Sequence, residues 1–223
     1  MSQKVFIFDL DGLLVDSEPS HFKAYRDILA SYGVFINRSE FIDGWLSGEQ
    51  YGMKLYLGKV GISDPGKIAL IRAKKKEYFL KLAKGKLRAM SGVKEFLEKA
   101  LADGIKCGVG TGAYHEEYNF MLEQCGLASY FSRCVGGDEV IFNKPAPDIF
   151  LGVADYFGVC PSECLVFENS SMGLTAAKNA KMKCVIIPSE YTKEQNFFGA
   201  DRVVASFKEL EVGQLRAMVE CDH

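Results

Sequence analysis

The strongest constraint on the fold is a run of four apolar residues that ends directly in two carboxylates. Residues 5–8 show no polar alternation, which indicates a strand buried on both faces of a parallel sheet. Asp9 and Asp11 follow at once, with Gly12 beside them. Two carboxylates at the mouth of an apolar sheet repel each other and lose hydration unless a cation or a shared proton compensates. Ligands of open α/β sheets bind at this end of the strands, so we expect a site here, although capping and turn aspartates would give a similar pattern.

Length and composition limit the class of protein. With 223 residues, 48% of them hydrophobic, the chain can bury a full core as one large domain or as a domain with an insertion. With a net charge of -2, the chain lacks the excess of positive charge that is typical of proteins that bind nucleic acid or an anionic membrane. The first residues lack a signal-peptide layout, and no apolar run is long enough to span a bilayer. The seven scattered cysteines favour free thiols in a reducing cytoplasm, and none has the spacing of a zinc site.

The segment after the first strand has a helical pattern. Asp16 and Ser17 are good helix caps and Pro19 suits a first turn, so we expect a helix to begin here. Apolar residues then recur at helical spacing to about residue 86, and no buried strand is predicted. A run of lysines in this segment is expected to form a solvated helix face, with Lys74, Lys75, Lys76, Lys81 and Lys84 as its members.

Strands and helices alternate in the remainder of the chain. The predicted helices cover residues 93–103, 115–125, 148–157 and 172–180, and the predicted strands cover 105–110, 134–135, 164–167 and 183–188. This alternation is typical of βαβ units in a parallel sheet covered on both faces. The sequence therefore predicts a doubly wound α/β core of residues 1–16 and 87–223, with an α-helical cap of residues 17–86 inserted after the first strand.

Polar residues follow the predicted strands at four places, of which Asp9 and Asp11 are the first. Thr111 lies between Gly110 and Gly112, where small neighbours let a hydroxyl and backbone N–H groups approach an anion. A glycine-rich turn with a capping threonine would explain this segment equally well.

The third and fourth places are the loop of Lys144 and the segment beginning at Glu168. Two prolines stiffen the loop around Lys144, and Asp148 is expected to cap the following helix. Glu168 and Asn169 follow a buried apolar run and precede another predicted helix. Each feature has an ordinary explanation by itself, as a surface lysine or a helix cap, so the prediction depends on their coincidence at one edge of the sheet.

The chemistry of these groups suits a phosphate ester and Mg²⁺. Carboxylate and amide oxygens without His or Cys are ligands that Mg²⁺ prefers, and Mg²⁺ commonly shares a substrate phosphate. Lys144 adds a second positive charge. The two cations would offset the repulsion between a carboxylate and a phosphate dianion, about 4 kcal/mol per unit-charge pair at about 4 Å with an effective dielectric of about 20. Phosphoryl transfer is catalysed mainly by such positioning and charge compensation.

With these residues in place, the chain resembles the haloacid dehalogenase superfamily, specifically its phosphatases similar to β-phosphoglucomutase with a helical cap. The resemblance covers nearly the whole chain. It is carried by four stretches in the family's order and spacing: FDLDGLLVDSE, the GTG around Thr111, NKPAPDIF and VFENSSMGLTAAKNA. Four ordered motifs are a specific signal, whereas DxD alone would be weak.

The resemblance implies a role for each matching residue. Asp9 would be the nucleophile that forms an aspartyl-phosphate, and Asp11 would be the general acid and then the general base. Thr111 and Lys144 would hold and neutralise the phosphate, with Gly12 and Gly112 beside it. The cofactor would be Mg²⁺, and the residues at the family's metal positions are Asp9, Asp11 (also through its backbone carbonyl), Glu168 and Asn169.

One residue departs from the family pattern at the metal site. Asn169 stands where an aspartate is more usual, so the site has one negative charge fewer. An amide oxygen can still bind Mg²⁺, and we expect weaker binding rather than none. Asp11 argues against a dehalogenase, because those members generally lack the second aspartate of this motif.

The cap is expected to select the substrate. Trp45, Ser47 and Glu49 are the candidate contacts, although Trp45 suits the core of the cap equally well. Ser47 and Tyr51 stand where the mutase has a lysine and an arginine, which favours hydrolysis over mutase chemistry. His21 matches the cap-hinge histidine of the mutase, and is also a candidate substrate contact, but it could equally be structural.

The leading prediction is Mg²⁺-dependent hydrolysis of a small phosphate monoester, in particular a sugar phosphate, by a cytoplasmic enzyme. Its partner would be a small phosphorylated metabolite rather than nucleic acid or a membrane. Two alternatives stay open: a sugar-phosphate mutase, and a catalytically weakened module that binds a phosphorylated ligand. No motif defines the oligomeric state, and a monomer is compatible with the sequence.

Overall fold

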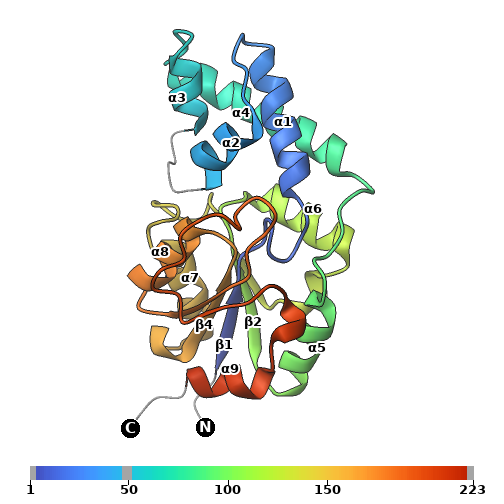
Figure 1. Cartoon of the computed structure of the whole chain (residues 1–223), viewed down its shortest axis with the longest axis vertical. Helices are drawn as coiled ribbons and strands as arrows, with labels where there is room; N and C mark the ends of the chain where they lie inside the picture. The colour runs from blue at the N-terminus through green and yellow to red at the C-terminus, as the bar shows by residue number, and fades with distance from the viewer. Residues whose placement is uncertain (1–3, 47–51, 220–223) are drawn as a thin grey trace.

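The computed structural model describes residues 4–46 and 52–219 and shows a twisted sheet with helices on both faces (Figure 1). A second group of helices lies beyond one end of the sheet (Figure 1). None of the helices described is long and apolar enough to cross a membrane.

The sheet is parallel and has β1 at its centre. Its six strands lie in the order β3-β2-β1-β4-β5-β6. β1 pairs in register with β2 on one side and with β4 on the other, and all four of its residues are fully buried. This arrangement confirms the predicted α/β fold class. The strands are β1 (Val5–Phe8), β2 (Lys106–Gly110), β3 (Arg133–Val135), β4 (Cys164–Glu168), β5 (Lys183–Ile186) and β6 (Arg202–Val203).

Each face of the sheet has its own hydrophobic cluster. Side chains alternate between the faces along a strand, so Phe6 and Phe8 lie in one cluster while Val5 and Ile7 lie in the other. The first cluster is completed by α5 (Val93–Ala102), α6 (His115–Cys125) and α9 (Val212–Met218). The second is completed by α7 (Asp148–Phe157) and α8 (Ser171–Asn179). Three short 3-10 helices connect these elements: η2 (Ala128–Tyr130), η3 (Pro161–Glu163) and η4 (Phe207–Glu209).

Most predicted elements lie within two residues of the observed ones, and α6 and α7 have the predicted bounds. Two details were wrong. Ser17 occupies the N-cap position of the helix that was predicted to begin here, but its side chain makes no capping hydrogen bond, and Asp148 occupies the first turn of α7 without making one. β6 and α9 were not predicted.

The remaining helices form a group that we call the helical region. It consists of α1 (Glu18–Ala30), α2 (Arg38–Phe41), the π-helix η1 (Ile42–Leu46), α3 (Gly52–Gly58) and α4 (Pro65–Ala83). These helices enclose a separate hydrophobic cluster around Leu29, Phe41 and Leu57. Trp45 packs at the edge of this cluster, with ring centroids 4.6 Å from Tyr25 and 5.5 Å from Tyr56.

Two linkers join the helical region to the sheet, and they are hydrogen-bonded to each other. The backbone N–H of Asp16 donates to the carbonyl of Arg88 at 3.0 Å, and that of Met90 donates to the carbonyl of Leu14 at 2.9 Å. Residues 14–16 and 88–90, which we call the paired linkers, therefore run side by side in opposite directions.

Candidate active site

Asp9 lies directly after β1 and is held by a buried lysine. Its backbone N–H donates to the carbonyl of Phe167 at 2.9 Å, which continues the pairing of β1 with β4. Lys144 Nζ lies 2.6 Å from Asp9 Oδ1 and 2.7 Å from Glu168 Oε1. All three charged side chains are buried. The structure thus brings together three of the predicted site residues from three separate segments.

Burial and charge oppose each other in this cluster. Burial raises the pKa of Asp9 well above its ordinary value of 3.8, and the charges of Glu168 and Asp11 raise it further, while Lys144 lowers it. Burial alone would lower the pKa of Lys144, but the two carboxylates outweigh that effect and raise it. Lys144 is therefore a buried cation that stays charged across the physiological pH range.

Glu168 is fixed through both of its carboxylate oxygens. Oε1 accepts from Lys144, while Oε2 accepts from the backbone N–H groups of Asn169 at 2.8 Å and Ser170 at 2.9 Å and from the Ser170 hydroxyl at 3.0 Å. A Cβ atom at Gly173 would lie only 1.7 Å from Oε1, so this arrangement requires glycine there. Because its oxygens are already engaged, Glu168 is better placed to balance Lys144 than to bind a metal directly.

Asp11 faces a different set of partners. Its Oδ1 accepts from the Ser17 hydroxyl at 2.5 Å and lies 2.9 Å from His21 Nε2. Burial would raise the pKa of Asp11, but His21, Ser17 and Lys75 together lower it below 3.8. The two aspartates of the motif therefore differ in character, since the pKa of Asp9 is raised and that of Asp11 is lowered.

Lys75, which contacts His21 on the side of the ring away from Asp11, was not identified as a site residue from the sequence. Lys75 Nζ lies 2.8 Å from His21 Nδ1 and 3.5 Å from Glu117 Oε1 on α6. An ammonium group can only donate, so Nδ1 is the acceptor and a neutral imidazole carries its proton on Nε2, which lies 2.9 Å from Asp11 Oδ1 but is not aligned with it for a hydrogen bond. His21 also stacks on Phe79, with ring centroids 3.8 Å apart. The prediction that Lys75 belongs to a solvated helix face is wrong, because only 4% of this residue is exposed.

Thr111 and Gly112 lie at the end of β2, the strand next to β1. Thr111 is fully buried, its backbone N–H donates to the carbonyl of Val135, and its hydroxyl accepts from the N–H of Ala113 at 3.1 Å. A Cβ atom at Gly112 would lie 3.3 Å from Asn143 Oδ1, which in turn accepts from the backbone N–H of Lys144. The Thr111 turn therefore packs against the loop that carries the buried lysine.

Gly12 allows two further polar side chains to approach the Asp9–Asp11 turn. It has a φ of +76°, and a Cβ atom there would lie 2.4 Å from Glu18 Cδ and 2.5 Å from Asn169 Nδ2. Asn169 Nδ2 donates to Glu18 Oε1 at 3.2 Å. Burial raises the pKa of Glu18 to about 7. Glu18 was missed as a site residue because, in sequence, it is simply an acidic residue in the first turn of a helix.

The side-chain oxygen atoms at the carboxyl end of the central strands are of the type that Mg²⁺ prefers. Among the residues described, no group of three or more His, Cys, Asp or Glu side chains is arranged to hold a metal. The predicted metal ligands are instead of two kinds, because they include the amide of Asn169 as well as carboxylates such as that of Asp9. The hydrogen bond to Glu18 uses the amide nitrogen, which leaves the amide oxygen on the opposite side of the group. Mg²⁺ uses few protein oxygens and keeps several waters, so such a sparse oxygen set is compatible with it.

The predicted substrate contacts of the helical region are only partly described. Ser47 and Glu49 lie outside the described residues, and Trp45 packs with the aromatic cluster. The helical region meets the core through Arg38, whose Nη2 donates to the carbonyl of Glu190 at 2.8 Å, and through the carbonyl of Leu46, which accepts from Gln195 Nε2 at 3.1 Å. A pocket of about 630 Å³ lies along this contact.

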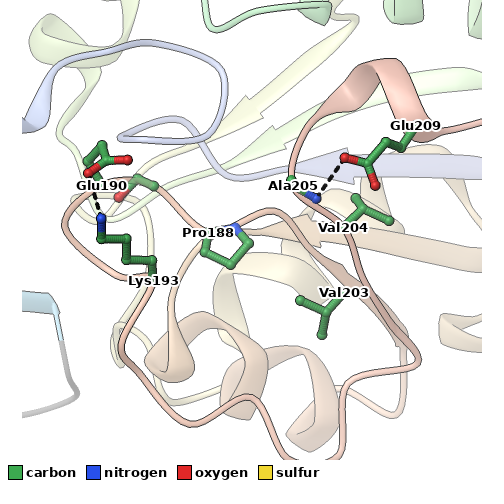
Figure 2. Close-up of a pocket in the computed structure, with 8 residues that line it drawn as sticks. Pro188, Glu190, Lys193, Val203, Val204, Ala205 and Glu209 are labelled. Carbon is green, nitrogen blue, oxygen red and sulfur yellow. Dashed lines mark hydrogen bonds and ion pairs between the residues drawn. The ribbon is translucent and has the colours of Figure 1, made fainter.

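A second pocket, of about 500 Å³, lies at the edge of the sheet between the segment after β5 and the segment around β6 (Figure 2). Pro188 and Val203 face each other across it, and Glu190 and Lys193 form an ion pair at one side (Figure 2). Neither pocket is lined by Asp9, so the assignment of the site depends on the arrangement of charged side chains and not on pocket volume.

Known proteins of one family are similar to this chain in sequence and in fold. The family model described as haloacid dehalogenase-like hydrolase matches residues 6–187. Protein CbbY from Rhodobacter capsulatus is 32% identical over 222 residues, covering 90% of this chain and 92% of that protein. A phosphorylated carbohydrates phosphatase from Thermotoga maritima is 34% identical over 178 residues, covering 78% of this chain and 80% of that protein. The crystal structure of a CbbY mutant from Rhodobacter sphaeroides in complex with xylulose-(1,5)-bisphosphate is similar to this structure with a TM-score of 0.80 and 28% identity, covering 94% of this chain and 96% of that one.

Proposed function

This chain belongs to the haloacid dehalogenase-like hydrolase family, and we propose that it is a Mg²⁺-dependent phosphatase of small phosphate monoesters, in particular sugar phosphates. The observation that carries the proposal is the buried contact of Lys144 with both Asp9 and Glu168 at the carboxyl end of the central strands. A lysine in this place lowers the cost of bringing a phosphate to a carboxylate.

In the proposed reaction, Asp9 is the nucleophile. Its carboxylate attacks the phosphorus atom, an aspartyl-phosphate forms, and the bond from phosphorus to the leaving oxygen breaks. Asp11 donates a proton to that oxygen, and the alcohol leaves. Asp11 then takes a proton from a water molecule that attacks the aspartyl-phosphate, which releases phosphate and regenerates Asp9.

The surroundings of Asp11 suit the second half of this sequence. Its lowered pKa and its contacts with Ser17 and His21 favour the carboxylate, which is the form that accepts a proton from water. For the first half, Asp11 must be protonated and must exchange its contact with His21 for one with the leaving oxygen. Substrate binding therefore changes the partners of Asp11.

Mg²⁺ would be held by oxygen atoms of Asp9, Asp11 and Asn169, and when bound it would neutralise charge on the phosphate. The remaining predicted member of the set, Glu168, would act through Lys144. Thr111 and Gly112 would contact the phosphate, because they follow the strand next to β1.

The names of the relatives support a sugar phosphate as the substrate. One is a phosphatase of phosphorylated carbohydrates, and the CbbY structure contains a xylulose bisphosphate. We propose that residues 17–86 act as a cap that admits the substrate and then shields it from bulk water, with Trp45, Ser47, Glu49 and His21 as the first positions to test for specificity. We also propose that the enzyme acts in the cytoplasm on metabolites.

The test is phosphate release from a panel of sugar phosphates and an aryl phosphate, with Mg²⁺ and with excess EDTA. We expect release that requires Mg²⁺, and we expect Asp9→Asn to abolish it while circular dichroism shows an intact fold. Asp16→Asn is the matched control, because it makes the same change at an exposed aspartate near the same turn. Release by Asp9→Asn would show that the nucleophile is wrong. Conversion of a sugar phosphate to an isomer without free phosphate would indicate a mutase instead.

A further inference from the structure

We propose that Glu18 and Asn169 act as one unit at the Mg²⁺ site. In its ionised form, Glu18 holds the amide of Asn169 with the amide oxygen available to the metal, and it supplies from one hydrogen bond away the negative charge that an aspartate at 169 would carry. The inference rests on the proposed function, because it concerns the same site. It makes Glu18 a positioning residue rather than a catalytic one.

The first argument is the geometry of the pair. Glu18 opens α1 and Asn169 follows β4, and both residues are only 3% exposed. Asn169 Nδ2 donates to Glu18 Oε1 at 3.2 Å, and the hydroxyl of Ser189 also bonds to Glu18. An ionised carboxylate accepts hydrogen bonds and cannot donate them, so with Glu18 ionised the amide nitrogen faces Glu18, as the structure has it, and the amide oxygen faces away.

The second argument is the position of the pair against the Asp9–Asp11 turn. Both side chains occupy the space beside Gly12, where a Cβ atom would lie 2.4 Å from Glu18 Cδ and 2.5 Å from Asn169 Nδ2. Gly12 follows Asp11 directly, so the pair packs on the same turn that carries the proposed nucleophile and the general acid. This turn is where a metal that serves both aspartates would lie.

The third argument is charge. An aspartate at 169 would place a second carboxylate about as close to Glu18 as the present hydrogen bond, and two buried carboxylates so close cannot both stay ionised. The amide avoids this repulsion and gains a hydrogen bond. A hydrogen bond from a ligand to a carboxylate behind it also makes the ligand oxygen a better donor to a metal, and loss of such a partner typically costs about 10- to 100-fold in metal affinity.

The experiment measures binding of Mg²⁺ alone to the full-length chain, by isothermal titration calorimetry and by the rise in melting temperature on adding MgCl₂. The variants are Glu18→Gln, Asn169→Asp and the double variant, which exchanges the two groups and keeps the total charge. Glu123→Gln is the matched control, because it removes one carboxylate from an exposed position on α6.

We expect Glu18→Gln to weaken Mg²⁺ binding about tenfold or more. Asn169→Asp alone is expected to lower the melting temperature in EDTA, and the double variant is expected to regain most of the affinity of the wild type. Glu123→Gln should bind Mg²⁺ as the wild type does.

Three results would overturn the inference. Wild-type affinity in Glu18→Gln, even with a lower melting temperature in EDTA, would mean that Glu18 is only structural. Tighter Mg²⁺ binding by Asn169→Asp, with an unchanged melting temperature in EDTA, would mean that Glu18 does not require an amide at position 169. Absence of saturable Mg²⁺ binding in the wild type would overturn the proposed Mg²⁺-dependent function and this inference together, whereas the first two results leave that function intact.

Discussion

Lys144 holds two buried carboxylates together, so replacing it with methionine tests how the charges of the site are balanced. Lys144→Met keeps an unbranched apolar stem but removes the ammonium group that lies 2.6 Å from Asp9 and 2.7 Å from Glu168. Removing one partner of a buried ion pair typically costs about 3–5 kcal/mol. Since two carboxylates lose their cation here, we expect the free energy of unfolding in EDTA at pH 8 to fall by about 4 kcal/mol.

The cost should depend on pH in a defined direction. Burial already raises the pKa of Asp9 well above 3.8, and Lys144 is the strongest influence that lowers it. Without Lys144 the pKa rises further, so the folded variant binds a proton that the unfolded chain has released at the same pH. Stability of the variant therefore falls as the pH rises from about 4 toward the raised pKa of Asp9. We expect the loss relative to the wild type to be smaller at pH 5 than at pH 8 by at least about 1 kcal/mol.

The assay is urea unfolding followed by circular dichroism at pH 5 and pH 8. Lys76→Met is the matched control, because Lys76 also pairs with a glutamate, Glu116 at 2.5 Å, but the two side chains are 33% and 62% exposed. An exposed pair of this kind contributes less than about 1 kcal/mol. The reasoning is refuted if Lys144→Met costs no more than Lys76→Met, or if its cost is the same at both pH values.

Three further predictions concern the packing around the site. Gly173→Ala would place a Cβ atom 1.7 Å from Glu168 Oε1, and urea unfolding should show a loss of about 3 kcal/mol; a loss below about 1 kcal/mol would contradict the tight contact. Burial raises the pKa of Glu18 from 4.5 to about 7, so between these pH values the folded protein binds a proton that the unfolded chain has released. The free energy of unfolding in EDTA should therefore fall by about 3 kcal/mol as the pH rises through this range. Glu18→Gln should flatten this dependence of stability on pH. Glu117→Gln removes the carboxylate 3.5 Å from the buried ammonium of Lys75 and should cost about 2 kcal/mol in thermal unfolding; an unchanged melting temperature would mean that another carboxylate balances Lys75.

The sheet and the position of the candidate site at its edge could be predicted because their signals are local. The apolar run of β1 ends directly in Asp9 and Asp11, so strand, turn and carboxylates are read from one short segment. α6 and α7 have helical periodicity and clear ends, and their bounds were predicted correctly. In contrast, β6 has only two residues and therefore no period that a pattern could reveal.

The contacts of Asn169 and His21 could not be predicted, because they join distant parts of the chain. Asn169 meets Glu18 across 151 residues, and Lys75 meets His21 across 54. Lys75 has lysines on both sides in the sequence, yet it alone among Lys74, Lys75 and Lys76 is buried. Lys75 lies at helical spacing from the buried Ile71 and Phe79, so the apolar periodicity of α4 could have placed it inward, whereas its contact with His21 on α1 has no local signal.

The paired linkers determine how readily the helical region could be exchanged. Because residues 14–16 and 88–90 are hydrogen-bonded to each other, the chain leaves the core and returns to it at adjacent points. A unit whose two ends lie this close can be replaced by another compact unit without moving the strands on either side of the junction. Recombination between relatives at these two points would therefore yield proteins with the same sheet and a different helical region. If the helical region selects the substrate as proposed, its exchange as a single unit would change the substrate range.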